Sequence, residues 1–419
     1  MGIITVEGGN PLQGELIVQG AKNSVLPILS AAVLSEGVCR ICRCPRLRDV
    51  ENAAAILRHL GCTVLWEDED LVVDASRLCR CDIPEDLMRA MRSSVIFLGA
   101  ILARCGCARI SYPGGCELGP RPIDLHLSAL RTLGAEIREG GGTLCCRARN
   151  LQGHDIVLAF PSVGATENAI LCACGAPGTT VITNAAREPE IVDLQNFLLK
   201  AGAHVQGAGT ATVTVTGGFP LHGCTHRCIG DRIVAATYLC AAAATGGDVL
   251  LRDIDPRHLA TVIDALRQAG CLIHCEEDRI ALTVSSPPCA VPVVRTSPYP
   301  GFPTDAQAVL MAALLQSRGT SVFVENIFEN RYRHVPELQR MGADIRTAGR
   351  VAVVTGTRQL QGTSVHCTDL RGGAALVIAA LQAQGQSRIY ETEHIARGYE
   401  DIVRDLTALG ANIHYFEEN

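Results

Sequence analysis

The chain has 419 residues, of which 47% are hydrophobic and 19% charged, and its formal net charge is −6 because 43 acidic residues outnumber 37 basic ones. This composition excludes a disordered chain, and the acidic balance argues against a nucleic-acid binder, which needs a basic surplus. No uncharged apolar run reaches the roughly 18 residues of a membrane helix, and the first residues do not resemble a secretion signal. We therefore expect a cytoplasmic protein of two or three domains, without nucleic-acid or membrane partners.

Two strands are predicted at the start of the chain, at residues 3–7 and 15–18, because apolar and polar residues alternate there. The rest of the chain repeats one pattern. Six segments end a helical pattern with an apolar residue, a glycine and a small residue, and then continue as a strand. The glycines are spaced by 73, 68, 68, 72 and 68 residues, and a glycine suits the left-handed conformation that ends a helix. They are Gly61, Gly134, Gly202, Gly270, Gly342 and Gly410.

Each repeat also contains a second helix rich in Ala, Gly, Cys and Leu, a composition typical of fully buried helices. After the glycine come two strands joined by a turn, but the sixth copy stops after the strand at residues 412–416. Its missing partner has to come from elsewhere, and the two N-terminal strands are the candidates. The predicted buried helices span residues 24–34, 93–103, 165–174, 233–244, 306–315 and 373–383.

Each unit therefore has the order strand, buried helix, strand, amphipathic helix and hairpin. Buried helices with sheets outside them predict an α/β fold of two inside-out barrels, each made of three repeated units. An ordinary doubly wound α/β sheet is the alternative, and the repeat period disfavours it. We expect one domain at residues 22–229, and a second at residues 1–21 and 230–419 that the N-terminal strands complete.

Twenty cysteines are many for such a chain, and several of them stand in C-x-C pairs. The cluster with metal-like spacing is Cys224-Thr225-His226-Arg227-Cys228, and it has no second ligand pair near it in the sequence. Without a secretion signal, the ordinary role of cysteine is that of a small buried apolar residue. We expect reduced thiols and no metal; a thiol-redox or metal protein is an alternative that only the cysteine count favours.

Cations gather where helices begin. The chain has only two lysines, Lys22 and Lys200, and arginines stand in the loops before the amphipathic helices. Helix N-termini attract anions, and guanidinium groups bind phosphate or carboxylate with two hydrogen bonds. The pattern indicates a polyanionic substrate with phosphate and carboxylate groups, although any single arginine can simply pair with a neighbouring acid, as Arg48 can with Asp49. Cations at or near the start of buried helices are Lys22, Arg92, Arg232 and Arg371.

Several motifs together resemble one family, the UDP-N-acetylglucosamine enolpyruvyl transferases, and the resemblance runs over essentially the whole chain. The most specific motif is the Pro-Gly-Gly-Cys loop at residues 113–116, within the longer match of residues 113–126. The known fold of this family, two inside-out α/β domains of three similar units each, agrees with the repeat count. The other matching motifs lie at residues 20–24, 91–94, 162–166, 187–190, 302–305, 328–331, 368–371 and 397–400.

The resemblance implies an activity in the first step of bacterial peptidoglycan synthesis. The family transfers the enolpyruvyl group of phosphoenolpyruvate to the sugar 3′-hydroxyl of UDP-N-acetylglucosamine and releases phosphate through a tetrahedral ketal. This chemistry needs an acid, a base and cations for the phosphate and carboxylate groups. The implied partners are these two small molecules; no cofactor, metal or protein partner is expected.

The resemblance also implies two groups that move protons. Cys116 corresponds to the general acid, which also forms a covalent adduct with phosphoenolpyruvate and reacts with the epoxide antibiotic fosfomycin. Its glycine neighbours predict an exposed loop, and nearby Arg121 favours the thiolate whereas Glu117 opposes it. Asp305 corresponds to the base toward the 3′-hydroxyl or to its orienting acceptor. From the sequence alone, Asp305 could also cap the helix predicted at residues 306–315.

The remaining site residues are implied by their positions in the motifs. Lys22, Arg121 and Arg397 match residues that hold the transferring phosphate, and Asn23 matches an amide at the reacting centre. Arg331 and Arg371 match a pair near the phosphoenolpyruvate carboxylate, with Asp369 close by. At Phe160 the chain lacks a lysine that some relatives carry near the diphosphate. The implied nucleotide-sugar pocket consists of Arg92, Arg121, Pro122, Ile123, Asp124, Leu125, Ser162, Val163, Gly164, Asp305 and Ile327.

Two other functions compete with this interpretation. A 5-enolpyruvylshikimate-3-phosphate synthase shares the fold and phosphoenolpyruvate, but its acceptor is a phosphorylated shikimate and it lacks the Pro-Gly-Gly-Cys loop. A non-catalytic paralogue would bind the nucleotide sugar without turnover. The presence of Lys22, Cys116, Asp305 and Arg397 disfavours the second alternative.

Overall fold

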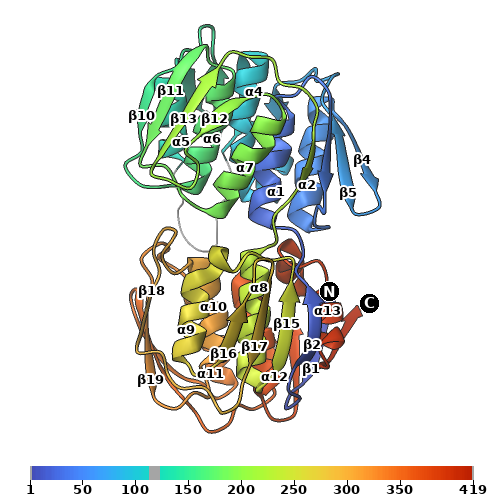
Figure 1. The fold of residues 1–419 in the computed structure, drawn as a ribbon, viewed down its shortest axis with the longest axis vertical. Coiled ribbons are helices and arrows are strands. Elements are labelled where there is room, and N and C mark those ends of the chain that lie inside the picture. Colours follow the sequence, from blue (N-terminus) through green and yellow to red (C-terminus); the bar gives the residue numbers. More distant parts are fainter. Residues whose placement is uncertain (1, 113–122, 418–419) are drawn as a thin grey trace. The chain divides into compact units, whose positions relative to one another are not determined.

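The computed structural model describes residues 2–112 and 123–417, so the predicted Cys116, Arg121 and Pro122 lie outside the described residues. The chain forms two compact units (Figure 1). The first contains the residues up to Gln19 and those from Gly230 onward, and the second contains residues from Gly20 to Ile229. Each unit has its own hydrophobic core.

The unit of residues 20–229 is built around buried helices. Helix α1 packs against α4, and α4 packs against α6. Almost every side chain of these helices is buried because apolar and small residues cover all of their faces, as the sequence predicts. The buried helices are α1 (Lys22–Ala32), α4 (Phe97–Cys105) with the preceding 3₁₀ helix η1 (Arg92–Ile96), and α6 (Val163–Cys174); outside them lie α2 (Arg48–Leu60), α3 (Glu85–Ala90), α5 (Asp124–Thr132) and α7 (Pro189–Lys200).

Within its described residues, this unit has three four-stranded sheets of the same design. In each sheet an edge strand pairs in parallel with the strand that follows a buried helix, and an antiparallel hairpin completes the sheet. The sheets have the orders β14–β3–β5–β4, β6–β7–β9–β8 and β10–β11–β13–β12. Their strands are β3 (Val38–Cys42), β4 (Thr63–Glu67), β5 (Asp70–Asp74), β6 (Asp82–Ile83), β7 (Cys107–Ser111), β8 (Glu136–Gly140), β9 (Thr143–Arg147), β10 (Asp155–Val157), β11 (Gly178–Thr183), β12 (His204–Gln206), β13 (Thr212–Gly217) and β14 (Thr225–Arg227).

The other unit repeats the arrangement. Its buried helices α8 (Arg232–Thr245), α10 (Thr304–Ala313) and α12 (Leu370–Gln382) all pack against one another. Outside them lie α9 (Ala260–Gln268), α11 (Val335–Arg340) and α13 (Ile402–Ala408), with the 3₁₀ helices η2 (Pro256–Leu259) and η3 (Thr392–Arg397). The strands are β1 (Gly2–Glu7), β2 (Gln13–Ile17), β15 (Asp248–Arg252), β16 (Leu272–Cys275), β17 (Arg279–Thr283), β18 (Val293–Arg295), β19 (Thr320–Val324), β20 (Asp344–Ala348), β21 (Val351–Thr355), β22 (Ser364–His366), β23 (Gln386–Tyr390) and β24 (Asn412–Glu417).

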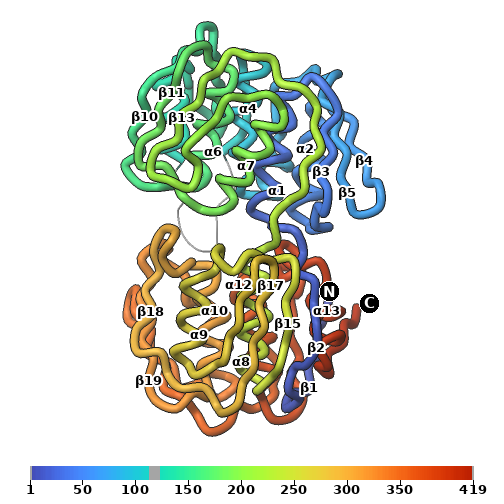
Figure 2. Tube along the Cα trace, in the orientation of Figure 1, coloured from blue at the N-terminus to red at the C-terminus, as the bar shows by residue number. Residues whose placement is uncertain are grey.

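The two N-terminal strands have different partners. Strand β1 fills the missing place in the last repeat, where it lies between β23 and β24 and joins the two ends of the chain in one sheet (Figure 2). Strand β2 does not join that sheet; it pairs in parallel with β15. In other repeats the edge strand leads into the buried helix of its own sheet, but β2 leads into α1 and β14 leads into α8. At each of the two places where the chain passes from one unit to the other, the edge strand therefore stays in the unit that the chain leaves, and the helix that follows it belongs to the unit that the chain enters.

The helix ends follow the repeat. All six repeat glycines have positive φ angles, between 91° and 102°. Such angles are strained for residues with a Cβ atom, which explains why glycine recurs at this place. The predicted α/β fold with buried helices and outer sheets is confirmed. No helix in the described part of the chain is both long and apolar enough to cross a membrane.

Candidate functional site

Lys22 is the first residue of α1, and its ammonium group is held by a buried carboxylate. Its Nζ atom lies 2.6 Å from Oδ2 of Asp49, in the first turn of α2. The sequence offered Arg48 as the neighbour for Asp49, but consecutive residues of a helix do not face each other. Instead, Asp49 points into the unit and meets Lys22. The next residue, Asn23, is half-buried.

A second group of predicted residues gathers around a histidine that the sequence interpretation did not single out. His126, on α5, is buried, and its Nδ1 atom lies 2.7 Å from Nδ2 of Asn168 on α6. A Cβ atom on Gly164 would come within 2.9 Å of the His126 ring, so glycine is needed there. Burial lowers the pKa of His126 to about 4; the charge of Asp124 raises it and that of Arg92 lowers it. Arg92, Asp124 and Gly164 thus surround a neutral imidazole.

Asn168 sets the relative positions of the helices in this group. Its Oδ1 atom accepts a hydrogen bond of 2.7 Å from Gly99 N in α4, and its Nδ2 atom donates to Val95 O in η1 at 2.9 Å. Because η1 also carries Arg92, the amide ties that arginine to α6. Asn168 lies just beyond the matching motif at residues 162–166.

The predicted nucleotide-sugar residues begin two helices. Ser162 caps α6, where its Oγ atom accepts a hydrogen bond from Ala165 N at 3.4 Å. Ile123 occupies the corresponding cap position of α5, directly before Asp124. The apolar side chains of Leu125 and Val163 pack against the core of the unit. These residues therefore present helix N-termini, which favour negatively charged ligands.

A neutral carboxylic acid is buried in the same unit. Glu167, on α6, has its pKa raised well above the ordinary value, first by burial and then by the charges of Glu190 and Glu188. The Arg187-Glu188-Pro189-Glu190 motif was singled out from the sequence, but Glu167 was not. A glutamate in a run of helical apolar residues is the signal that could have revealed it.

In the other unit, Asp305 is held between two arginines. Its Oδ1 atom accepts a hydrogen bond from Nη2 of Arg331 at 2.9 Å, and its Oδ2 atom accepts one from Nη2 of Arg371 at 3.2 Å. The alternative interpretation of Asp305 as a helix cap is wrong, because α10 begins at Thr304 and Pro303 stands at the cap position. Asp305 lies within the first turn of α10 instead.

Both arginines are buried and have further contacts. Nη2 and Nε of Arg331 donate to Thr304 O at 2.8 and 3.2 Å, which fixes the guanidinium against the start of α10. Burial lowers the pKa of Arg371, but the charges of Asp305, Tyr399 and Asp231 outweigh burial, and the net direction is upward. Its guanidinium carbon lies 5.9 Å from the centre of the Tyr399 ring. The guanidinium group of Arg371 is therefore charged inside the protein.

Asp369 and a second buried histidine complete this cluster. Asp369 caps α12, because its Oδ1 atom accepts hydrogen bonds of 3.0 Å from Arg371 N and Gly372 N. Burial raises the pKa of Asp369, but the charge of Arg331 and these hydrogen bonds lower it by more, so the net direction is downward. The ring of His334 is fully buried, and burial lowers its pKa to about 4. Its neighbours include Asp369 and Arg331, yet the sequence interpretation missed it.

Ile327 is placed by a buried glutamate. Oε1 of Glu325 accepts hydrogen bonds from Ile327 N at 2.8 Å and from Phe328 N at 3.0 Å, while Oε2 accepts one from Thr304 Oγ1 at 3.0 Å. Glu325 therefore ties the loop of Ile327 to the beginning of α10, next to Asp305. It was not predicted, because its partner Thr304 lies 21 residues earlier in the chain.

The other predicted cations behave differently. Arg397 is the last residue of η3 and is half-buried. Arg46 stacks on Trp66, with its guanidinium carbon 4.3 Å from the ring centre, and Arg257 pairs with Asp255 at 2.6 Å on the surface. Pairing with a nearby acid is therefore correct for Arg257, whereas Arg331 and Arg371 converge on one carboxylate.

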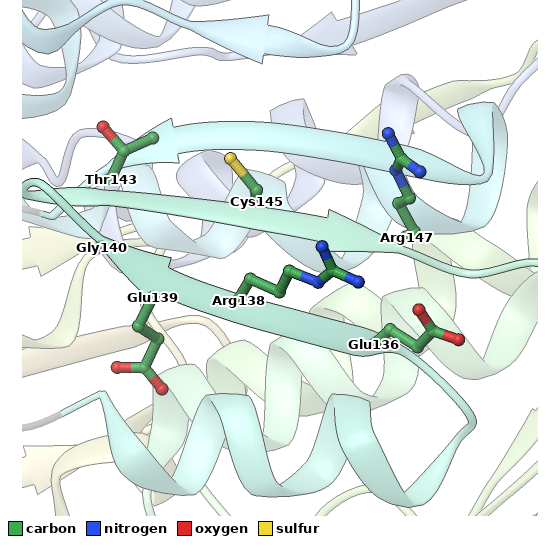
Figure 3. A pocket seen from close by; sticks show the side chains of 7 residues that line it. All are labelled: Glu136, Arg138, Glu139, Gly140, Thr143, Cys145 and Arg147. Carbon is green, nitrogen blue, oxygen red and sulfur yellow. The ribbon is translucent and has the colours of Figure 1, made fainter.

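Neither a metal site nor the surface pocket described below includes the predicted site residues in the described part of the chain. The described residues contain no group of three or more side chains able to hold a metal ion. A surface pocket of about 380 Å³ lies on the β8–β9 hairpin and contains none of the predicted site residues (Figure 3). Its lining is Glu136, Arg138, Glu139, Gly140, Thr143, Cys145 and Arg147.

Known proteins resemble this chain over nearly its whole length. The family model described as EPSP synthase (3-phosphoshikimate 1-carboxyvinyltransferase) matches residues 6–406. A UDP-N-acetylglucosamine 1-carboxyvinyltransferase 2 of Caldanaerobacter subterraneus subsp. tengcongensis is 49% identical over 413 residues, 99% of either chain. The UDP-N-acetylglucosamine 1-carboxyvinyltransferase of Halothermothrix orenii is 45% identical, also with 99% of both chains covered.

Solved structures show the same fold. The enolpyruvyl transferase NikO from Streptomyces tendae superposes with a TM-score of 0.88 at 26% identity, covering 99% of this chain and 98% of its own. An EPSP synthase from Acinetobacter baumannii reaches a TM-score of 0.77 at 19% identity, with both chains fully covered. The chain therefore belongs to the enolpyruvyl transferase family and, within it, to the UDP-N-acetylglucosamine 1-carboxyvinyltransferases.

Proposed function

We propose that the protein transfers the enolpyruvyl group of phosphoenolpyruvate to the 3′-hydroxyl of UDP-N-acetylglucosamine and releases phosphate. The observation that carries this proposal is the 45–49% identity to relatives of that name over nearly the whole chain. The reaction would be the first committed step of peptidoglycan synthesis, acting in the cytoplasm. Roles in cell shape and cell division would follow from the supply of wall precursor.

In the proposed addition step, the 3′-hydroxyl oxygen attacks C2 of phosphoenolpyruvate. Asp305 takes the hydroxyl proton, and the Cys116 thiol gives a proton to C3, which becomes a methyl group. The product is a tetrahedral ketal that still carries the phosphate. In the second step phosphate leaves and C3 loses a proton, which restores the double bond as an enol ether.

The environment of Asp305 supports its proposed role. Two guanidinium groups bind one oxygen each, so the carboxylate keeps one orientation. An ionised carboxylate can accept the hydroxyl proton, and a fixed one can orient the hydroxyl for attack. Asp305 is also more exposed than both arginines, as a group that meets the acceptor hydroxyl has to be.

The proposed anion contacts divide by chemical group. Lys22, Arg121 and Arg397 would bind the phosphate that leaves, and Asn23 would contact the reacting carbon. Arg331 and Arg371 would neutralise the phosphoenolpyruvate carboxylate, with Asp369 beside them; fixed positive groups of this kind stabilise charge that develops in the transition state. The nucleotide sugar would lie against Arg92, Arg121, Pro122, Ile123, Asp124, Leu125, Ser162, Val163, Gly164 and Ile327.

Identification of the product tests the proposal. The protein is incubated with UDP-N-acetylglucosamine and phosphoenolpyruvate, and mass spectrometry should find the nucleotide sugar with one added enolpyruvyl group. The Cys116→Ala variant is the control for the acid and should form product at least a hundredfold more slowly, about the contribution of a single acid–base group. Equal rates for parent and variant would contradict the proposed role of Cys116.

Reactivity provides a separate check on Cys116. Among twenty cysteines, fosfomycin should modify the peptide that contains Cys116 first, because an activated thiolate is the better nucleophile. Peptide mapping after short exposure measures the order of labelling. Labelling spread evenly over many cysteines would contradict an activated thiol at this position.

A further inference from the structure

A buried carboxylate on α7 lies against the first turn of α1. Asp193 accepts a short hydrogen bond from Ser24 Oγ at its Oδ2 atom, and its Oδ1 atom lies 2.9 Å from Nε2 of His226 on β14. Oδ2 also accepts a hydrogen bond of 3.3 Å from Ile229 N. Asp193, Ser24 and His226 are all buried. The carboxylate thus has three donors, one from α1 and two from β14 and the residues that follow it.

His226 belongs to the cysteine-rich cluster that the sequence offered as a weak metal site. Its Nε2 atom serves Asp193, and its ring meets Phe197 edge-on, with centres 5.8 Å apart and an interplanar angle of 84°. Its Nδ1 atom is buried and has no hydrogen-bond partner among residues 2–112 and 123–417. Burying an unpaired polar atom costs stability. An imidazole at this position is therefore explained by the hydrogen bond that it gives to Asp193.

The network leads directly to the backbone that precedes Lys22. Asp193 holds Ile229 N, and Ile229 O in turn accepts a hydrogen bond of 2.8 Å from Ala21 N. Three residues after Ala21, Ser24 is bound to the same carboxylate. Lys22 itself is held from the other side by Asp49 of α2. The first turn of α1 is thus fixed between α7 and α2, with Asn23 between the two fixed residues.

We propose that Ser24, Asp193 and His226 are positioning residues, which hold Lys22 and Asn23 in place for the phosphate and reacting carbon of phosphoenolpyruvate. The consequence for activity rests on the proposed function, whereas the positioning of Lys22 does not. None of the three residues touches substrate in this account. Loss of the network releases the first turn of α1 and moves the ammonium group of Lys22.

The composition of the chain allows a direct test of positioning without substrate. Only Lys22 and Lys200 are lysines, so protein labelled with ¹³Cε-lysine has two lysine side-chain resonances, which Lys22→Arg and Lys200→Arg assign. The Ser24→Ala, Asp193→Asn and His226→Phe variants should shift or broaden the Lys22 resonance and leave that of Lys200 unchanged. His226→Gln retains a side-chain N–H donor and should restore most of the parent spectrum.

A matched control separates positioning from simple loss of a buried hydrogen bond. Tyr238 donates a 2.7 Å hydrogen bond to Asp405 in the other unit, so Tyr238→Phe also removes one buried hydroxyl bound to a carboxylate. This variant should leave the Lys22 resonance unchanged. If the Lys22 resonance is the same in Ser24→Ala and His226→Phe as in the parent, the proposal is overturned. Ser24→Ala is the smallest change and keeps the test valid if Asp193→Asn does not fold.

Kinetics measure the consequence for the reaction. In Ser24→Ala and His226→Phe we expect kcat/KM for phosphoenolpyruvate to fall about tenfold, the factor that corresponds to one hydrogen bond. The dissociation constant of UDP-N-acetylglucosamine should stay within about twofold. An equal loss for both ligands contradicts positioning and indicates general destabilisation. If the parent has no transferase activity, the proposed function fails, and the lysine spectra still decide whether the network positions Lys22.

Discussion

Lys22 and Asp305 represent the two units, and they are held by the same device with opposite charges. The Lys22 side chain is 10% exposed, and that of its partner Asp49 is 1% exposed. The Asp305 side chain is 30% exposed, and its partners Arg331 and Arg371 are 2% and 4% exposed. In both units the more accessible charge is fixed by a more deeply buried charge of opposite sign. The comparison teaches that the more exposed charge of each pair is positioned from inside the protein, by a more deeply buried partner.

The largest effect is expected at Asp305, where the accessible charge does chemistry. Asp305→Asn keeps the size of the side chain but removes the proton acceptor, so kcat should fall about a thousandfold, within the range of a general base. Steady-state phosphate release measures the loss. A fall below about tenfold would show that orientation alone is the role of Asp305.

Removing the buried partner of Lys22 should affect stability. Asp49→Asn leaves the ammonium group without the ion pair, and breaking one side of a buried pair costs about 3 kcal/mol. Urea unfolding monitored by circular dichroism gives the free energy of unfolding. An unchanged free energy would indicate that Lys22 finds other partners of equal strength, and the device would not be the same in the two units.

Each unit also buries a neutral histidine beside its site, and His334 gives a pH prediction. Burial lowers its pKa in the folded state from 6.5 to about 4. Between these values the unfolded chain binds a proton that the folded chain does not, so stability is full above pH 6.5 and decreases as the pH falls toward 4. From pH 6.5 to pH 5 the loss is about 2 kcal/mol for one histidine.

The His334→Gln variant isolates this contribution. It should reduce the pH dependence of the free energy of unfolding by about 2 kcal/mol over that interval, because glutamine does not titrate. The measurement is a series of urea titrations from pH 6.5 to 5 on the parent and the variant. His126 is unchanged in both proteins, so its contribution to the pH dependence cancels in the comparison. A slope equal to that of the parent would contradict a neutral buried His334.

The smallest effect is expected at Glu167, which contrasts with Asp49. Glu167 is buried as a neutral acid, because burial and the charges of Glu190 and Glu188 raise its pKa. Glu167→Gln therefore removes no charge and should change the free energy of unfolding by less than about 1 kcal/mol. The same urea titrations compare it with Asp49→Asn. A loss as large as that of Asp49→Asn would show that Glu167 is ionised in the folded protein.

Much of the fold could be predicted from the sequence because it is local and repeated. The glycines at the helix ends and the all-apolar helices can each be identified from a short stretch of sequence. The partner of β2 could not be predicted. The sequence showed one place in a sheet without a strand, in the last repeat, and both N-terminal strands had a suitable pattern for it. The second such place, beside β15, was not apparent from the sequence. Pairing between strands far apart in the chain is not encoded in either strand alone.

The site shows the same limit. Asp305 and Lys22 stand in recognisable motifs, but the residues that hold them do not. Asp193 lies 169 residues from Ser24 in the sequence, and helical periodicity predicts only which face of α7 is buried. Buried polar residues inside apolar patterns, such as Asp193 and Glu167, are the signal that sequence interpretation can use, although it does not identify their partners.

The most direct test of the proposed activity is phosphate release with two acceptors in parallel. The protein is incubated with phosphoenolpyruvate and either UDP-N-acetylglucosamine or shikimate 3-phosphate, and inorganic phosphate is measured over time. The account predicts release with UDP-N-acetylglucosamine and none above background with shikimate 3-phosphate. Release with shikimate 3-phosphate alone would contradict it.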